Sequence, residues 1–219
     1  MCGIAGLIHR DGATSVGKEM TAMLKSLKHR GPDSTGFAVY GTSTTNEYVM
    51  RLKLAEQEDM TKDHHIRQKI RERQAEVDRM LAEIGAETIE VAEATPYAFR
   101  YRLRYAGDTR RLAADIEQIE GAEVLSFGSA LELIKDLGDA TRVSEQYGLG
   151  TFRGTHGIGH TRMATESAVT TDGAHPYSTG KDQCLVHNGS LSNHNNVRRV
   201  LKREGFAFET ENDTEVAAG

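Results

Sequence analysis

The sequence contains no tryptophan, only 6% aromatic residues and only two cysteines, Cys2 and Cys184. So few aromatic rings argue against the stacking platforms that bind single-stranded nucleic acid, and two cysteines are too few for a disulfide scaffold. No run approaches the roughly 18 uncharged apolar residues that a membrane span needs. The amino end also lacks the basic and apolar segments of a signal peptide, so we expect a cytoplasmic protein that does not enter a membrane.

Neither sign of charge dominates, because 27 basic and 32 acidic side chains give a net charge of −5. Such a chain has no electrostatic footprint for nucleic acid or for an anionic membrane surface. Its length of 219 residues fits one globular domain, or one domain that carries a large insertion.

Glycine is unevenly distributed along the chain. Seven of the 22 glycines fall in residues 1–50, ten in 148–219 and only five between them. Glycine serves where the backbone turns or approaches another group closely, so we expect two loop-rich ends around a helix-rich middle. The ends are predicted to contain a strand over 2–9 and an amphipathic helix of about 12 residues, marked by Met20, Met23, Leu24 and Leu27, that stops before Arg30. A hairpin of 36–41 and 46–51, strands over 157–165 and 183–187, and helices over 192–204 and from 212, with Asp213 as N-cap, are expected to follow.

The glycine-poor middle, 51–149, carries no phosphate-binding loop, metal-ligand cluster or acid–base pair. The highly charged stretch 51–84, with an apolar line from Ile66 to Ile84, predicts a solvated helix. The pattern further predicts strands over 87–94, 97–105 and 122–127, and helices over 109–119, 130–137 and 139–147. We interpret it as a helical and α/β insertion used for structure or contacts. Five histidines between 156 and 194 lack the carboxylate or cysteine spacing of a zinc site, so we predict no metal.

Cys2 becomes the terminal residue when the initiator methionine is removed. Its thiol and α-amino group then share one residue, and an amine with a pKa near ~7.7–8.0 can take a proton from a thiol with a pKa near ~8.5. A terminal amine is an established base for such a nucleophile. The alternative is a buried strand cysteine that happens to be second.

Five motifs accompany this cysteine in order: 1–6 (MCGIAG), 30–36 (RGPDSTG), 159–165 (GHTRMAT), 187–193 (HNGSLSN) and 212–216 (NDTEV). Together they resemble the glutaminase domain of class II glutamine amidotransferases, which are N-terminal-nucleophile (Ntn) hydrolases. The resemblance implies an α+β fold, a four-layer αββα sandwich of two antiparallel sheets between helix layers. It covers 1–50 and 150–219, so we expect a split domain, incomplete at its C-terminus, interrupted by the insertion.

The resemblance also implies roles for the motif residues. Cys2 is the nucleophile and its α-amine the base, while the side-chain amide of Asn188 and the backbone N–H of Gly189 form the oxyanion hole. Both follow an apolar strand, where a rigid element can present donors. The Asn-Gly pair could alternatively be a hairpin turn.

The remaining roles concern substrate. Arg162 can bind the α-carboxylate of glutamine through two hydrogen bonds, and Asp213 can accept from its α-ammonium group. Thr165 is a further substrate-binding residue, Arg30 a site wall and Asp33 structural. As alternatives, Arg162 would be a surface ion-pair residue and Asp213 a helix cap.

Two further expectations concern the region after Arg162. Residues 166–180 are predicted to form a loop that closes over glutamine, and Cys184 is predicted to be inert packing.

The predicted reaction is hydrolysis of the glutamine side-chain amide through a γ-glutamyl thioester on Cys2. The residues of the motifs at 159–165 and 187–193 are most similar to those of the separate amidotransferase subunits of glutamate-synthase-like systems, including N-methylglutamate synthase. That resemblance implies ammonia delivery to a synthase subunit on another chain, with FMN and iron–sulfur centres on that partner and no cofactor here. The alternatives are an N-terminal-cysteine amidohydrolase acting on another amide, or a non-catalytic interaction subunit that retains the fold.

Overall fold

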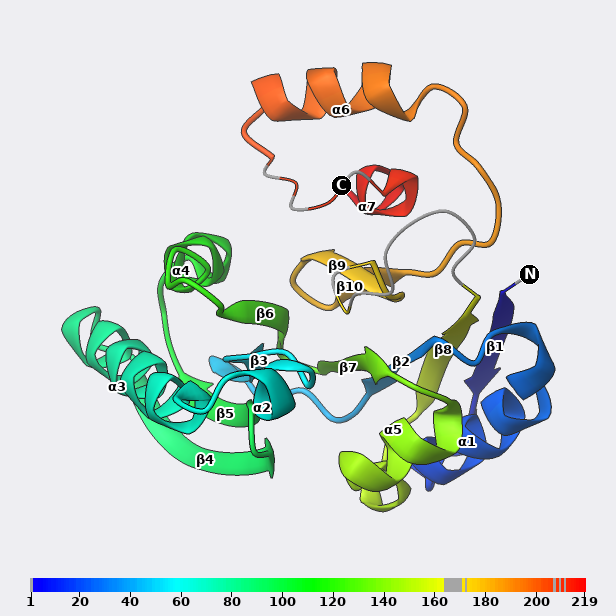
Figure 1. The fold of residues 1–219 in the computed structure, drawn as a ribbon, viewed down its shortest axis with the longest axis horizontal. Coiled ribbons are helices and arrows are strands. Elements are labelled where there is room, and N and C mark those ends of the chain that lie inside the picture. Colours follow the sequence, from blue (N-terminus) through cyan, green and yellow to red (C-terminus); the bar gives the residue numbers. More distant parts are fainter. Residues whose placement is uncertain (1, 164–170, 172, 207, 209, 211) are drawn as a thin grey trace.

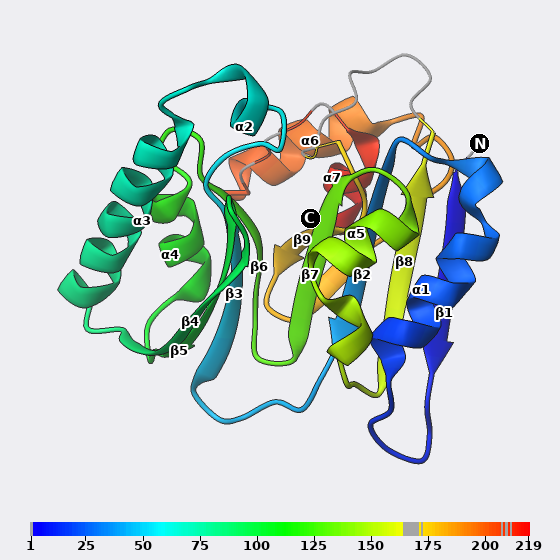
Figure 2. The ribbon, with the colours of Figure 1, turned by 60° about the horizontal axis from the view of Figure 1, so that its bottom comes forward.

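Two four-stranded antiparallel sheets lie side by side in the computed structural model, which describes residues 2–163, 171, 173–206, 208, 210 and 212–219. The sheet that carries the amino end, here the β1 sheet, has the order β1 (Gly3–Ile8), β8 (His156–Arg162), β2 (Ser34–Tyr40) and β7 (Leu131–Leu137). The β4 sheet has the order β4 (Glu87–Thr95), β5 (Ala98–Arg104), β3 (Glu47–Lys53) and β6 (Glu123–Gly128). Strands β6 and β7 are consecutive and bring the two sheets together (Figure 2).

Each of the two sheets is covered by its own pair of helices. The helices α1 (Val16–Ser26) and α5 (Ala140–Gln146) pack on one face of the β1 sheet, whereas α3 (Ile66–Glu83) and α4 (Thr109–Ile116) flank the β4 sheet (Figure 2). The short helix α2 (Asp59–Lys62) precedes α3, and single 3₁₀ turns η1 (Lys28–Arg30) and η2 (Leu149–Thr151) follow α1 and α5.

The opposite face of the β1 sheet carries a two-stranded pair, β9 (Tyr177–Gly180) and β10 (Gln183–Leu185). Helix α7 (Asp213–Ala218) packs on that pair, and α6 (His194–Arg203) packs on α7 (Figure 1). This mixed α/β architecture with antiparallel sheets is consistent with the predicted Ntn-type sandwich, while the complete four-layer arrangement stays a prediction.

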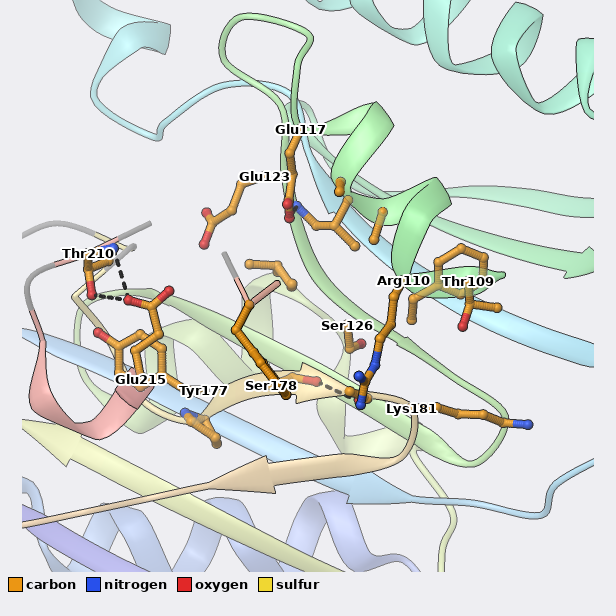
Figure 3. A pocket seen from close by; sticks show the side chains of 18 of the residues that line it. Thr109, Arg110, Glu117, Glu123, Ser126, Tyr177, Ser178, Lys181, Thr210 and Glu215 are labelled. Carbon is orange, nitrogen blue, oxygen red and sulfur yellow. Dashed lines mark hydrogen bonds between the residues drawn. The ribbon is translucent and has the colours of Figure 1, made fainter. Parts of the chain in front are cut away.

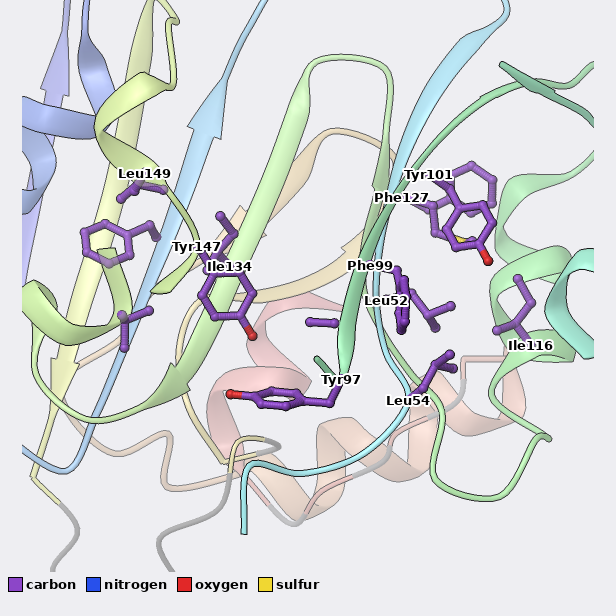
Figure 4. Close-up of a cluster of buried hydrophobic side chains, with 14 of the residues drawn as sticks. Leu52, Leu54, Tyr97, Phe99, Tyr101, Ile116, Phe127, Ile134, Tyr147 and Leu149 are labelled. Carbon is purple, nitrogen blue, oxygen red and sulfur yellow. The ribbon is translucent and has the colours of Figure 1, made fainter. Parts of the chain in front are cut away.

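One continuous apolar core extends through both sheets. Met20 and Leu24 of α1 are fully buried against the β1 sheet, and the core continues through Ile134 on β7 to Leu52 on β3 (Figure 4). Tyr101 of β5 is also fully buried, with its hydroxyl donating to Asp78 of α3 at 2.8 Å. No helix among the described residues is long and apolar enough to cross a membrane.

Two predictions of local structure were wrong. Residues 130–137 do not form a helix: 131–137 are strand β7, which pairs with β2 along seven residues, Ser34↔Leu137 to Tyr40↔Leu131. Strands β2 and β3 exist but do not form a hairpin, because β2 pairs with β7 and β8 whereas β3 pairs with β5 and β6. In both cases long-range strand pairing prevails over the local pattern.

The predicted insertion contributes directly to the layers that contain the amino end. Within 51–149, β7 completes the β1 sheet and α5 packs beside α1. The proposed division into 1–50 with 150–219 and an insertion of 51–149 stays a prediction, and the structure adds that 131–146 shares the sheet and helix layers of the amino end.

Candidate active site

Cys2 lies directly before the edge strand β1, which pairs only with β8 among the described strands, through Gly3↔Thr161 and its successors. The carbonyl oxygen of Cys2 accepts two side-chain hydrogen bonds. Nε of Arg30 donates at 3.1 Å and Nδ2 of Asn188 donates at 3.1 Å. Three predicted site residues, 28 and 186 positions apart along the chain, therefore meet at one atom.

Arg162 is the last residue of β8 and is only 7% exposed. Its carbonyl oxygen accepts the backbone N–H of Asp33 at 3.1 Å. Gly31 approaches so closely that a Cβ there would lie 2.5 Å from the Arg162 carbonyl carbon. The turn after η1 is thus fixed to the end of β8 by backbone contacts that no larger residue at position 31 would allow.

Asp213 is the first residue of α7, but it is not the helix cap that we predicted. Asn212 caps the helix, its side chain accepting from the N–H of Thr214 at 2.9 Å. The Asp213 carboxylate instead accepts the N–H of Leu191 at 2.6 Å and lies 3.8 Å from Nδ1 of His187. A carboxylate offers about four acceptor positions, so these contacts leave capacity for an ammonium group.

A group of histidines lies behind these residues, and sequence reasoning gave it no role. The rings of His160 and His175 stack at 4.2 Å, and Nε2 of His175 lies 2.8 Å from the hydroxyl of Thr214. The same hydroxyl lies 3.3 Å from Nδ1 of His187. Burial lowers the pKa of His160 to about 4 and lowers the pKa of His175 further, so both rings are neutral at physiological pH. The only sequence signal for them was the clustering that we had weighed as a metal site.

Comparisons with known proteins identify the family of the chain. The domain family described as "Glutamine amidotransferase domain" matches residues 140–218. The chain is 43% identical, over its whole length, to "Glutamine amidotransferase-like protein GlxB" of Rhizobium meliloti (strain 1021) and covers 68% of that protein. It is 37% identical over 98% of its length to a "Putative glutamine amidotransferase" of Methanothermobacter thermautotrophicus, of which it covers 70%.

The chain belongs to the class II glutamine amidotransferases. A shorter match supports the class: 35% identity over 98 residues, which are 45% of this chain and 16% of the relative, to "Glutamine--fructose-6-phosphate aminotransferase [isomerizing]" of Idiomarina loihiensis. The predicted family and enzyme class are confirmed.

Of the remaining predicted site residues of this amidotransferase, the structure describes Gly189 but not Thr165. Gly189 follows Asn188, and a Cβ on it would lie 2.8 Å from Nε2 of His187. Thr165 lies outside the described residues, as do 166–170 and 172 of the predicted loop. The end of that loop is not loop at all, because Tyr177–Gly180 form β9.

Cys184, the second thiol of the amidotransferase, lies on β10 with its Sγ 3.1 Å from the hydroxyl of Tyr40. Burial raises the pKa of this thiol. A partly buried, protonated thiol is a poor nucleophile, which agrees with the packing role that we predicted.

A cavity of about 300 Å³ lies between α4, β6 and β9 (Figure 3). Lys135 and Glu123 form an ion pair of 2.9 Å in its wall. None of the predicted site residues is among its described lining. In the part of the chain that the structure describes, no group of three or more histidine, cysteine or acidic side chains could hold a metal ion.

Proposed function

We propose that this glutamine amidotransferase hydrolyses the side-chain amide of glutamine with Cys2 as nucleophile. The observation that carries the proposal is the pair of hydrogen bonds from Arg30 and Asn188 to the Cys2 carbonyl oxygen. They hold residue 2 against two of the other motifs, and β1 pairs with the strand that ends at Arg162.

After removal of Met1, the α-amine of Cys2 takes the thiol proton and the sulfur attacks the amide carbon of glutamine. The tetrahedral oxyanion accepts hydrogen bonds from Asn188 and from the backbone N–H of Gly189. A carboxamide NH₂ has two hydrogens, so one can hold Cys2 while the other faces the oxyanion. Each such donor is worth roughly 2.7–4 kcal/mol in the transition state.

The carbon–nitrogen bond then breaks as the amine returns its proton to the leaving nitrogen. Ammonia departs and a γ-glutamyl thioester remains on Cys2. Water attacks the thioester with the same amine as base, which releases glutamate and restores the thiol.

Glutamine brings an α-carboxylate and an α-ammonium group that both need partners once water is excluded. Arg162 and Asp213 supply them, Thr165 adds a polar contact, and Arg30 forms the wall beside Cys2. The order of α1 with α5, the β1 sheet, the β9–β10 pair and α7 (Figure 1) supports the four-layer sandwich that such a site occupies in Ntn hydrolases.

The ammonia is delivered to a synthase subunit on a separate chain, of the glutamate-synthase-like kind, with FMN and iron–sulfur centres on that partner. The support is the similarity of the GHTRMAT and HNGSLSN motifs to those of such amidotransferase subunits. Affinity purification of the tagged protein from its own cells, followed by mass spectrometry, tests for such a subunit, and recovery of no synthase in repeated experiments contradicts it.

The reaction is tested by glutamate release from glutamine, with Cys2→Ala expected to abolish activity and Cys184→Ser expected to retain it. Intact-mass measurement with a thioester-trapping glutamine analogue should find one adduct, on residue 2. A folded wild-type protein that forms no adduct and releases no glutamate overturns the proposal. Release of ammonia from another amide, but not from glutamine, would instead favour a different amidohydrolase.

A further inference from the structure

We propose that the ion pair of the buried Lys53 with Glu56, together with the hydroxyl of Thr171, forms an anchor that positions Arg162 for glutamine. This inference rests on the proposed glutaminase reaction and assigns a role in substrate binding to the region predicted as an insertion. Lys53, Glu56 and Thr171 are positioning residues, because they act through Arg162 and do not themselves contact substrate.

The anchor is compact, with Lys53 and Thr171 fully buried and Glu56 partly exposed. Lys53 ends β3 and is 1% exposed, and Thr171 is 0% exposed. Nζ of Lys53 donates to both carboxylate oxygens of Glu56 at 3.0 Å and to the hydroxyl of Thr171 at 2.8 Å. The hydroxyl of Thr171 in turn donates to Oε2 of Glu56 at 2.6 Å. The Thr171 hydroxyl thus accepts a hydrogen bond from the Lys53 ammonium and donates one to the Glu56 carboxylate.

The anchor is rigid because a second carboxylate braces it from the β1 sheet. Asp136 of β7 is 0% exposed, and its Oδ1 lies 4.0 Å from Nζ of Lys53. Its Oδ2 accepts the hydroxyls of Tyr97 and Tyr147, both at 2.8 Å. The ammonium of Lys53 therefore sits between two carboxylates that are themselves fixed.

Described residues that follow Thr171 in the chain contact the proposed substrate-binding residue. The N–H of Ala174 donates to the carbonyl of Thr171 at 2.8 Å. Gly173 lies against the Arg162 guanidinium, since a Cβ at 173 would be 2.9 Å from Nη1. His175 then stacks on His160 of β8, two positions before Arg162. Displacing Thr171 would thus move the surface on which the Arg162 side chain rests.

Burying an ion pair costs desolvation free energy that its attraction often only offsets, so stability alone gives little reason to place Lys53 here. Holding one backbone segment in one position is a use that such a pair can serve. Because the guanidinium recognises a carboxylate through two parallel hydrogen bonds, a small rotation of Arg162 weakens substrate binding without touching Cys2. The expected effect is on KM rather than on kcat.

The test compares Thr171→Val, which removes the hydroxyl at nearly constant volume, with Thr171→Ser, which keeps it. Thr171→Val removes both hydrogen bonds of the hydroxyl, to the Lys53 ammonium and the Glu56 carboxylate. Because the loss reaches substrate only through Arg162, we expect KM for glutamine to rise about tenfold, with kcat within twofold. Thr171→Ser should restore KM to within about threefold of wild type. Glu56→Gln, at a partly exposed position, is a second variant with a smaller expected rise.

Tyr101→Phe is the matched control, because it removes a buried hydroxyl that donates to Asp78 of α3. Tyr101 lies on β5 of the β4 sheet, whereas Arg162 ends β8 of the β1 sheet. The substitution should lower thermal stability but leave KM unchanged. When Arg162 is already replaced by Lys, Thr171→Val should not raise KM further, because the guanidinium that the anchor positions is no longer present.

Unchanged KM in both Thr171→Val and Glu56→Gln would overturn the anchor, provided that the wild type is active and Cys2→Ala is not. A similar KM rise in Tyr101→Phe would overturn it as well, since the effect would then be general loosening. An inactive wild type would instead count against the proposed reaction and would be seen before any variant is made.

Discussion

The β1 sheet and the β4 sheet are both four-stranded and antiparallel, but different forces hold them. In the β1 sheet, glycines let backbone meet backbone: a Cβ on Gly36 would lie 1.9 Å from the carbonyl oxygen of His175. The β4 sheet and its border with β7 carry charged pairs, such as Arg51 and Arg100 on Glu132. The β1 sheet brings the main chain of several motifs close together. The β4 sheet stabilises the β1 sheet through side-chain ion pairs at their common border.

The two kinds of contact should differ in their tolerance of substitution. A backbone contact has no rotamer with which to relieve a clash. A charged pair tolerates substitution only where it lies at the surface, because there the remaining side chain can move or be solvated. Three changes, from the largest expected effect to the smallest, would break or sharpen this contrast.

Gly36→Ala is expected to destabilise the protein by about 4 kcal/mol or more, because the added methyl group would overlap the His175 carbonyl and Pro176. Urea unfolding measures the change. Gly150→Ala is the control, since nothing lies within 4 Å of a Cβ there, and its effect should stay within about 0.5 kcal/mol. If Gly36→Ala and Gly150→Ala lowered the free energy of unfolding equally, the close backbone contacts of the β1 sheet would not be the reason for its intolerance.

Glu132→Gln is expected to cost about 3 kcal/mol, because it leaves the guanidinium of Arg51, only 4% exposed, without its charge partner. Arg104→Gln, whose ion pairs with Glu47 and Glu87 are at the surface, should change stability by less than about 0.5 kcal/mol. Both are read from the free energy of unfolding at pH 7.5. A loss for Arg104→Gln as large as that for Glu132→Gln would contradict the argument from burial.

Acid should destabilise the folded protein through the group of histidines behind the site. The pKa of His160 is about 4 in the folded protein and about 6.5 when unfolded, so the unfolded state binds more protons between these values and stability falls as pH falls. This one group should cost about 2 kcal/mol between pH 7.5 and pH 5. The control is His160→Gln, which should show a shallower dependence over that interval in urea unfolding, and an unchanged slope would show that the ring does not titrate as expected.

Much of the β4 sheet and of the glycine-rich ends could be predicted from sequence, because hydrophobic spacing and turn residues act locally. The error at 130–137 has a physical reason: Leu131, Leu133, Ile134 and Leu137 fit one helical face, and only pairing with β2, about 100 positions away, makes the segment a strand. The wrong hairpin of 36–41 and 46–51 has the same origin, since neighbouring strands here belong to different sheets.

The candidate site was predictable as a set of motifs but not as a geometry. The motifs named Cys2, Arg30 and Asn188, yet nothing in them indicated that two side chains meet at the carbonyl oxygen of the third. The bridge by Thr214 between His175 and His187 was missed, because a hydroxyl next to Asp213 gives no periodic or charge signal. The catalytic and binding roles of these residues stay predictions until the variants are measured.

The hydrogen bond from Asn188 to Cys2 spans 186 positions, and this has a consequence for timing in the cell. The proposed nucleophile is the second residue to leave the ribosome, and Asn188 follows 186 positions later, roughly 10–40 s at ordinary rates of synthesis. Until Asn188 has been made, the thiol lacks the side-chain donor of the proposed oxyanion hole. If the proposed reaction is correct, a nascent chain that has not reached Asn188 should therefore hydrolyse glutamine at least roughly 100-fold more slowly than the finished protein.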